Sequence, residues 1–123
     1  MIVGIGVDVI EPERIARAMA NPRFIERMYT PRERQHIAQA GANAAQRAAG
    51  IFAAKEAAVK ALGCGFDGVG FHDVEVTSAA SGQPGLELHG GAAARLAALA
   101  GARAHLSISH IASAAVAFVI IEG

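Results

Sequence analysis

The sequence predicts an α+β domain: an antiparallel sheet with one long central helix and short N-terminal helices. Two observations predict it. Apolar or alternating segments typical of strands lie near both ends of the chain and in two probable hairpins, whereas the alanine-rich stretch 44–62 has the length and composition of a helix. Residues 1–123 form a single domain, because this length is close to the commonest domain size.

The first segment, residues 2–10, is predicted to be a buried strand rich in valine and isoleucine. Alternate residues of a strand share a face, so Gly4, Gly6 and Asp8 align. The two glycines leave room for another backbone or for a ligand beside the carboxylate.

Three short helices are predicted after this strand, over about 12–20, 23–28 and 31–40. Each boundary carries a local signal. Prolines suit a first helical turn, an Asn-Pro pair ends the first helix, and Thr30 with Glu33 has the spacing of a capping box.

The long helix 44–62 is predicted to end at Gly63, the first of several glycines. Beyond them, 73–77 and 85–89 alternate polar and apolar residues about a Ser-Gly-Gln-Pro turn. These two segments are predicted to form a hairpin.

The last third of the chain predicts a helix over 92–100 and a second hairpin made of strands 105–110 and 114–121. The final strand has too little polar alternation for a solvent-exposed edge. We therefore expect this strand to be buried.

Composition excludes several classes of protein. No apolar run approaches the ~20 residues that span a bilayer, and no charged segment precedes the N-terminal apolar stretch, so neither a membrane anchor nor a signal peptide is expected. The single cysteine, Cys64, fits a reducing compartment, and we expect a cytoplasmic protein. Zero net charge, no tryptophan and few other aromatic residues disfavour nucleic acid as a partner.

The charges are nevertheless uneven, because residues 11–34 hold six arginines against four glutamates. This segment is either ordinary solvated surface or a docking surface for an acidic protein, since guanidinium groups pair well with carboxylates. The arginines are Arg14, Arg17, Arg23, Arg27, Arg32 and Arg34.

Phe52, Glu56 and Lys60 are spaced four residues apart and share one face of the long helix. Asp8 is a second carboxylate, at the end of an apolar strand. Two carboxylates without further protein ligands are poor for zinc but suit Mg²⁺, which keeps waters and takes other oxygens from substrate phosphates. The pattern favours chemistry on a phosphate-bearing substrate.

Simpler roles exist for each of these residues. Asp8 could form a salt bridge or cap the following helix, and Lys60 could form an i,i+4 ion pair with Glu56. As functional alternatives, Lys60 could bind a phosphate or act as a base. His105 and His110 are ambiguous polar residues of the final hairpin.

Four motifs of the sequence resemble, in order and separation, those of the bacterial holo-acyl-carrier-protein synthases, the short trimeric type of 4′-phosphopantetheinyl transferase. The resemblance covers essentially the whole chain. The motifs are Gly4-Ile5-Gly6-Val7-Asp8, Phe52-Ala53-Ala54-Lys55-Glu56-Ala57 with Lys60-Ala61, Gly82-Gln83-Pro84, and His105-Leu106-Ser107-Ile108-Ser109-His110.

The resemblance implies an enzyme that moves the phosphopantetheine arm of coenzyme A onto a serine of apo-acyl carrier protein and releases adenosine 3′,5′-bisphosphate. It implies Asp8 and Glu56 as Mg²⁺ ligands, Lys60 as an active-site cation and His105 as a further group at the site. The base that activates the serine is left open between a metal-bound water, Lys60 and Glu56. Residues implied in coenzyme A binding are Arg47, Phe52, Lys60, Gly63, Gly82, Pro84 and His105.

The resemblance also gives the basic segment a purpose, because acyl carrier proteins are small and acidic. It implies Arg14 as the main carrier contact, with Arg17, Arg23 and Arg27 behind it. It further implies a homotrimer with active sites between subunits, so that a neighbouring copy completes each site. In such a trimer we expect strand 114–121, or the Ser107–Ser109 strand beside it, near the three-fold axis, where a charge such as Val119→Glu would be disruptive.

Departures from the family's pattern concern coenzyme A. Relatives often carry a basic residue where Ile51 stands and a lysine where Gln83 stands, and both losses weaken the expected grip on the 3′-phosphate. Arg47, one turn before Ile51, is a candidate substitute. Ile111 stands where some relatives have an acid after the second histidine.

Two other functions remain as alternatives. A metal-dependent hydrolase of nucleotide pyrophosphates could use the same carboxylates, and would consume coenzyme A with water. A non-catalytic trimeric module could bind an acidic protein without any dependence on magnesium, with Asp8, Glu56 and Lys60 as structural ion pairs.

Overall fold

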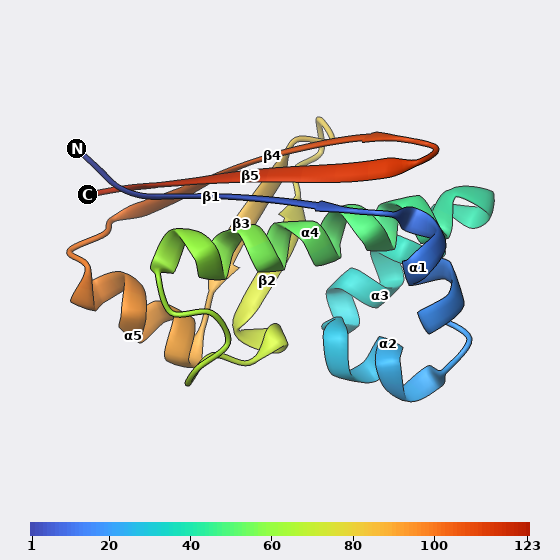
Figure 1. The fold of residues 1–123 in the computed structure, drawn as a ribbon, viewed down its shortest axis with the longest axis horizontal. Helices are drawn as coiled ribbons and strands as arrows, with labels where there is room; N and C mark the ends of the chain where they lie inside the picture. The colour runs from blue at the N-terminus through green and yellow to red at the C-terminus, as the bar shows by residue number, and fades with distance from the viewer.

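A computed structural model describes all of residues 1–123, and Figure 1 shows a layered arrangement in which α4 lies against one face of a three-stranded sheet. The elements are β1 (Ile2–Ile10), α1 (Pro12–Ala18), α2 (Pro22–Met28), α3 (Pro31–Ala38), η1 (Gly41–Asn43), α4 (Ala44–Leu62), η2 (Phe71–Asp73), β2 (Val74–Ser78), β3 (Pro84–Leu88), α5 (Gly90–Ala98), β4 (Arg103–Ile111) and β5 (Ala114–Glu122).

The main sheet is antiparallel with the order β1-β5-β4, and β2 pairs with β3 in a separate two-stranded sheet. The prediction of an α+β fold with a long central helix is confirmed. The final strand β5 occupies the middle of the main sheet, with Asp8 of β1 opposite Ala117 and Ser107 of β4 opposite Phe118. Its continuous apolar character follows from this central position.

The packing of β1 on α4 depends on two glycines. A β-carbon at Gly4 would overlap the carbonyl oxygen of Ala61, and one at Gly6 would overlap that of Ala57. The prediction that these glycines make room for another backbone is confirmed. The helix presents small side chains toward the sheet, and Ala53 and Ala57 are completely buried.

Local signals set most helix boundaries. The capping box forms as predicted: Thr30 N–H donates to Glu33 Oε1 at 2.8 Å, and Glu33 N–H donates to Thr30 Oγ1 at 3.3 Å. The helix α4 ends at Gly63, whose φ of 73° is left-handed. The first helix ends at Ala18, earlier than predicted, because the following amides form a tighter turn.

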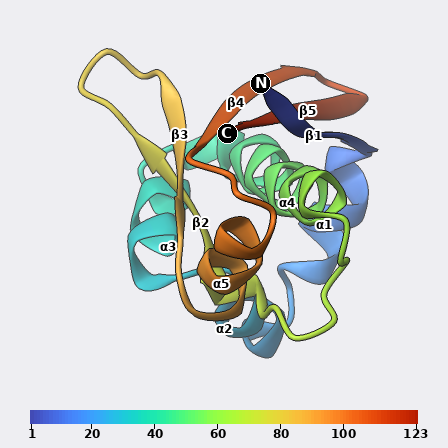
Figure 2. The same cartoon turned by 90° about the vertical axis from the view of Figure 1, so that its left-hand side faces the viewer.

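No element covers the face of the main sheet that points away from α4 (Figure 2). Apolar side chains are exposed on this face. Ile5, Val9 and Phe118 are 61%, 65% and 43% exposed. Val119 instead faces α4 and is completely buried, since successive strand residues point to opposite faces. The expectation that Val119→Glu probes a subunit interface is therefore wrong, and Phe118 is the outward residue of that strand.

No helix of the structure combines the length and the apolar character that a bilayer crossing requires.

Candidate functional site

A cavity of about 400 Å³ lies where the end of β1 meets α1, α2 and α4. Two carboxylates and one guanidinium group stand in an otherwise apolar lining. The lining residues are Asp8, Val9, Ile10, Arg14, Ile15, Ala18, Phe24, Phe52 and Glu56.

Asp8 reaches this cavity because it follows Gly6 on the strand face that packs on α4. Its side chain is 17% exposed. Lys60 Nζ donates to Asp8 Oδ1 at 3.1 Å and to the carbonyl oxygen of Val7 at 3.1 Å. Lys60 therefore joins the helix to the strand, and the simple i,i+4 pair with Glu56 does not form.

Glu56 lies one turn before Lys60 and has no ion-pair partner within 4.0 Å. Burial raises the pKa of Glu56 above its ordinary value, the charge of Asp8 raises it further, and the charge of Lys60 offsets only part of this. Two neighbouring carboxylates with a single half-exposed ammonium group beside them favour an added cation. This donor set of hard oxygens beside an open cavity fits Mg²⁺.

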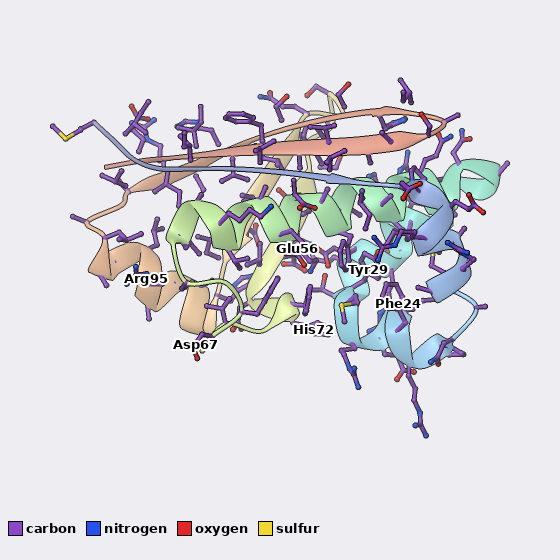
Figure 3. The ribbon with its side chains drawn as sticks, in the orientation of Figure 1. Phe24, Tyr29, Glu56, Asp67, His72 and Arg95 are labelled. Atoms are coloured by element: carbon purple, nitrogen blue, oxygen red, sulfur yellow. The ribbon has the colours of Figure 1, made fainter.

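Aromatic side chains form one wall of the cavity. The Phe24 and Phe52 rings are stacked with centroids 6.4 Å apart, and Phe71 continues the row at 5.9 Å from Phe52 (Figure 3 labels Phe24). Phe52 was predicted at the site. Phe24 was not, because nothing in the sequence indicates that α2 folds back onto α4.

A second cavity, of about 340 Å³, lies between α3, α4, the β2–β3 hairpin and β4. It brings Arg47 of α4 together with Gly82 and Pro84 of the Gly-Gln-Pro turn, which are remote from it in the sequence. His36 and His110 also line it. Arg47 Nη1 donates to the carbonyl oxygen of His36 at 2.8 Å, and burial together with the charge of Arg47 lowers the pKa of His36.

His105 is not near the carboxylates within one chain. It lies on β4 with its side chain on the outer face of the sheet, where Nε2 is 3.0 Å from Glu122 Oε1. Asp8 faces the opposite way, toward α4. Gly63 lines neither cavity and serves as the C-cap of α4.

The four arginines expected to bind a carrier, Arg14, Arg17, Arg23 and Arg27, are exposed, and none of them forms a salt bridge. They lie on α1 and α2. Only Arg14 also lines the first cavity. These four arginines thus form an unpaired cationic surface on α1 and α2, which Arg14 connects to the cavity of Asp8 and Glu56.

Glu75, Glu87 and His89 form a third polar group, which the sequence did not reveal, with ligand atoms within 4.8 Å of one another. Arg32 Nη1 bridges the two carboxylates at 3.2 and 2.9 Å, and Thr30 Oγ1 donates to Glu75 at 2.6 Å. Although burial opposes its charge, these hydrogen bonds and the charge of Arg32 lower the pKa of Glu75. Both carboxylates already pair with Arg32, and the group ties the β2–β3 hairpin to α3.

Comparison with known proteins agrees with this geometry. A family model described as the 4′-phosphopantetheinyl transferase superfamily matches residues 4–118. The chain belongs to this superfamily. Its relatives include the holo-[acyl-carrier-protein] synthase of Solidesulfovibrio magneticus, 48% identical over 100% of both chains, and that of Nitratidesulfovibrio vulgaris strain DP4, 49% identical over 99% of both.

Solved structures show the same fold. The holo-[acyl-carrier-protein] synthase of Neisseria meningitidis superposes with a TM-score of 0.91 at 34% identity over 100% of both chains. The enzyme of Bacillus anthracis, in complex with CoA (3′,5′-ADP), gives 0.84 at 39% identity over 100% of this chain and 98% of that one. The resemblance inferred from the four motifs is confirmed.

The raised pKa of Glu56 predicts a measurable effect on stability. A carboxyl whose pKa is raised by folding stabilises the fold at low pH, and this contribution is lost as pH rises through the folded-state pKa. Glu56→Gln removes the buried charge. In EDTA, we expect this variant to melt at a higher temperature than the wild type at about pH 7.5, with the difference shrinking toward about pH 4.

Glu26→Gln, which changes an exposed carboxylate on α2, is the control for this measurement. Added Mg²⁺ should raise the melting temperature of the wild type and of the control, but not of Glu56→Gln. Equal pH profiles for Glu56→Gln and the wild type would contradict the electrostatic description of the site.

Proposed function

We propose that the cavity between Asp8 and Glu56 is the active site for the reaction of a holo-acyl-carrier-protein synthase. In this reaction the 4′-phosphopantetheine group of coenzyme A moves to a serine of apo-acyl carrier protein, and adenosine 3′,5′-bisphosphate leaves. The convergence of Asp8, on β1, with Phe52, Glu56 and Lys60, which share one face of α4, carries the proposal. Family membership over the whole chain favours this transfer over a pyrophosphate hydrolase or a non-catalytic module.

Asp8 and Glu56 would hold Mg²⁺, which when bound would withdraw negative charge from the pyrophosphate of coenzyme A. The Lys60 ammonium is half exposed and already donates hydrogen bonds to two oxygens. These contacts hold the ammonium group in one place. Lys60 therefore suits a role as a fixed cation for a phosphate oxygen better than a role as the base.

The second cavity is the proposed site for the nucleotide end of coenzyme A. Arg47, a charged residue of its lining, takes the place of the basic residues that relatives often carry where Ile51 and Gln83 stand in this chain. The backbone at Gly82, with a φ of 88°, and the ring of Pro84 shape the opposite wall. His36 and His110 add two polar groups that can donate to an anion.

A second copy of the chain is the proposed partner for the outer face of the sheet. The exposed Ile5, Val9 and Phe118 form an apolar surface of the kind that subunits cover. His105 lies on this same face, so an active site between subunits could include it although it is remote from Asp8 in its own chain. A homotrimer would cover the apolar surface and would bring His105 of one chain to the active site of another. The cytoplasmic location stays a prediction.

Transfer is tested by incubating the protein with coenzyme A, Mg²⁺ and apo-acyl carrier protein and then measuring the mass of the carrier. We expect the carrier to gain one phosphopantetheine group. Asp8→Ala should lower the rate at least about 100-fold, since it removes one of two carboxylates. Asp67→Ala, an exposed change in a loop, is the control. Consumption of coenzyme A without a change in carrier mass would indicate the hydrolase, and no consumption would indicate the binding module.

Carrier docking predicts a charge effect at α1. Arg14→Glu should weaken carrier binding by about 1–3 kcal/mol, because it places a carboxylate against an acidic protein. Arg14→Lys keeps the charge and should bind nearly normally. Titration calorimetry with the carrier checks this, and the KM for coenzyme A should change much less than carrier affinity. Unaltered affinity in Arg14→Glu, with no weakening by salt, would mean that the carrier docks elsewhere.

Assembly predicts that Phe118→Glu separates the subunits while each chain stays folded, because an unpaired carboxylate in an apolar interface has no compensating contact. Light scattering measures the mass, and circular dichroism checks the fold. Ala38→Glu, on the exposed end of α3, is the control. A wild-type protein that is fully active as a monomer would refute the shared site.

A further inference from the structure

A completely buried ion pair lies between the two cavities and belongs to neither lining. Lys55 of α4 and Glu33 of α3 are both 0% exposed, with Lys55 Nζ 2.7 Å from Glu33 Oε1. We call these two residues the buried pair. The transfer chemistry described above uses neither of them.

All the hydrogen-bonding capacity of the Lys55 ammonium is directed at fixed positions. Besides Glu33, Nζ donates to the carbonyl oxygens of Phe71 at 2.7 Å and Val74 at 2.9 Å. An ammonium group has three N–H donors, so none is left over. Lys55 thereby fixes α4 to η2 and to the first residue of β2.

The Glu33 carboxylate is equally committed. Its Oε1 also accepts from Thr30 N–H at 2.8 Å, and its Oε2 accepts from the amide of Val76 at 2.7 Å. The second contact is made to the middle of β2. The buried pair thus joins α3, α4 and the hairpin through charged hydrogen bonds that are sheltered from water.

These anchored elements form the walls of both cavities. Glu56, directly after Lys55, lines the first cavity, whereas Ile51, one turn before Lys55, lines the second. Val76, held by Glu33, also lines the second cavity, as does His36, one turn after Glu33 on α3.

Stability alone does not account for such a pair, because well-packed apolar residues of similar volume often stabilise a fold equally well or better. An apolar pair makes no directional hydrogen bonds, however, and so would not fix the orientation of the hairpin relative to α4. The β2–β3 hairpin is a two-stranded sheet of its own, and such hairpins are marginally stable without outside support. Its other polar attachments to α3, through Arg32 and Thr30, include the solvent-exposed Arg32 bridge.

We propose that Lys55 and Glu33 are positioning residues for the transfer: they hold the β2–β3 hairpin in register with α4, so that the second cavity and Glu56 keep a fixed relation. The proposal rests on the proposed role of the second cavity in binding the nucleotide end of coenzyme A. Neither residue touches the reacting atoms.

The test compares steady-state kinetics in Lys55→Met and in the double variant Lys55→Met with Glu33→Gln. The double variant removes both charges at similar volume, so no unpaired buried charge remains to unfold the chain. In both variants we expect the KM for coenzyme A to rise about tenfold and kcat to fall, while the KM for the carrier stays unchanged. None of the hydrogen bonds of the buried pair reaches α1 or α2, which carry the carrier surface.

Val59→Ala is the matched control. Val59 is buried on the same helix, one turn after Lys55, and lines neither cavity. This variant should melt at a lower temperature but keep the wild-type KM for coenzyme A. Hydrogen exchange gives a readout that is independent of activity: the amides of β2 should exchange faster in the double variant than in Val59→Ala.

A wild-type KM for coenzyme A in the double variant, or slow exchange of the β2 amides, would overturn the positioning role and leave the pair as filling for the core. A wild-type protein that transfers nothing to the carrier would instead refute the proposed function. The two failures are therefore distinguishable in the same set of measurements.

Discussion

The close contact between the backbone of β1 and the backbone of α4 is the constraint on which the rest of the structure depends. It exists because Gly4 and Gly6 have no β-carbon to strike the helix carbonyls, and because the facing side of the helix is built from alanine. Asp8 follows on the same strand face, so its carboxylate emerges beside the helix at the level of Lys60. Larger side chains at Gly4 and Gly6 would push β1 away from α4, separate Asp8 from Glu56 and disrupt the first cavity.

The pairing of charges distinguishes the proposed site from the other polar groups of the molecule. Lys55 pairs with Glu33, and Arg32 contacts both Glu75 and Glu87. At the first cavity a single lysine lies beside two carboxylates and pairs only with Asp8. Glu56 is left with a raised pKa and no partner. A site that leaves a partly buried carboxylate unmatched is prepared for a cation, at some cost to the stability of the metal-free fold.

The outer face of the sheet relates the fold to assembly. The strands β1 and β5 are buried on one side by α4 but expose apolar residues on the other, where His105 and Glu122 also lie. One chain thus offers a polar pair and an apolar surface on the same face. The proposed homotrimer would bring this surface against another copy. His105 could then lie at the active site of a neighbouring subunit, which it does not reach within its own chain.

Sequence alone determined the elements and several members of the site. The Thr30–Glu33 capping box, the stop at Gly63 and strand alternation act between near neighbours, so their effects can be inferred without knowing the fold. The motifs containing Asp8 and Glu56 indicated the family. Tertiary structure decided that Lys60 pairs with Asp8 and not with Glu56, and which face of β5 is covered by α4. It also decided that Arg47 meets Gly82 and Pro84. These outcomes depend on distances between elements remote in the chain, and helical spacing or strand alternation fixes only the directions of side chains within one element.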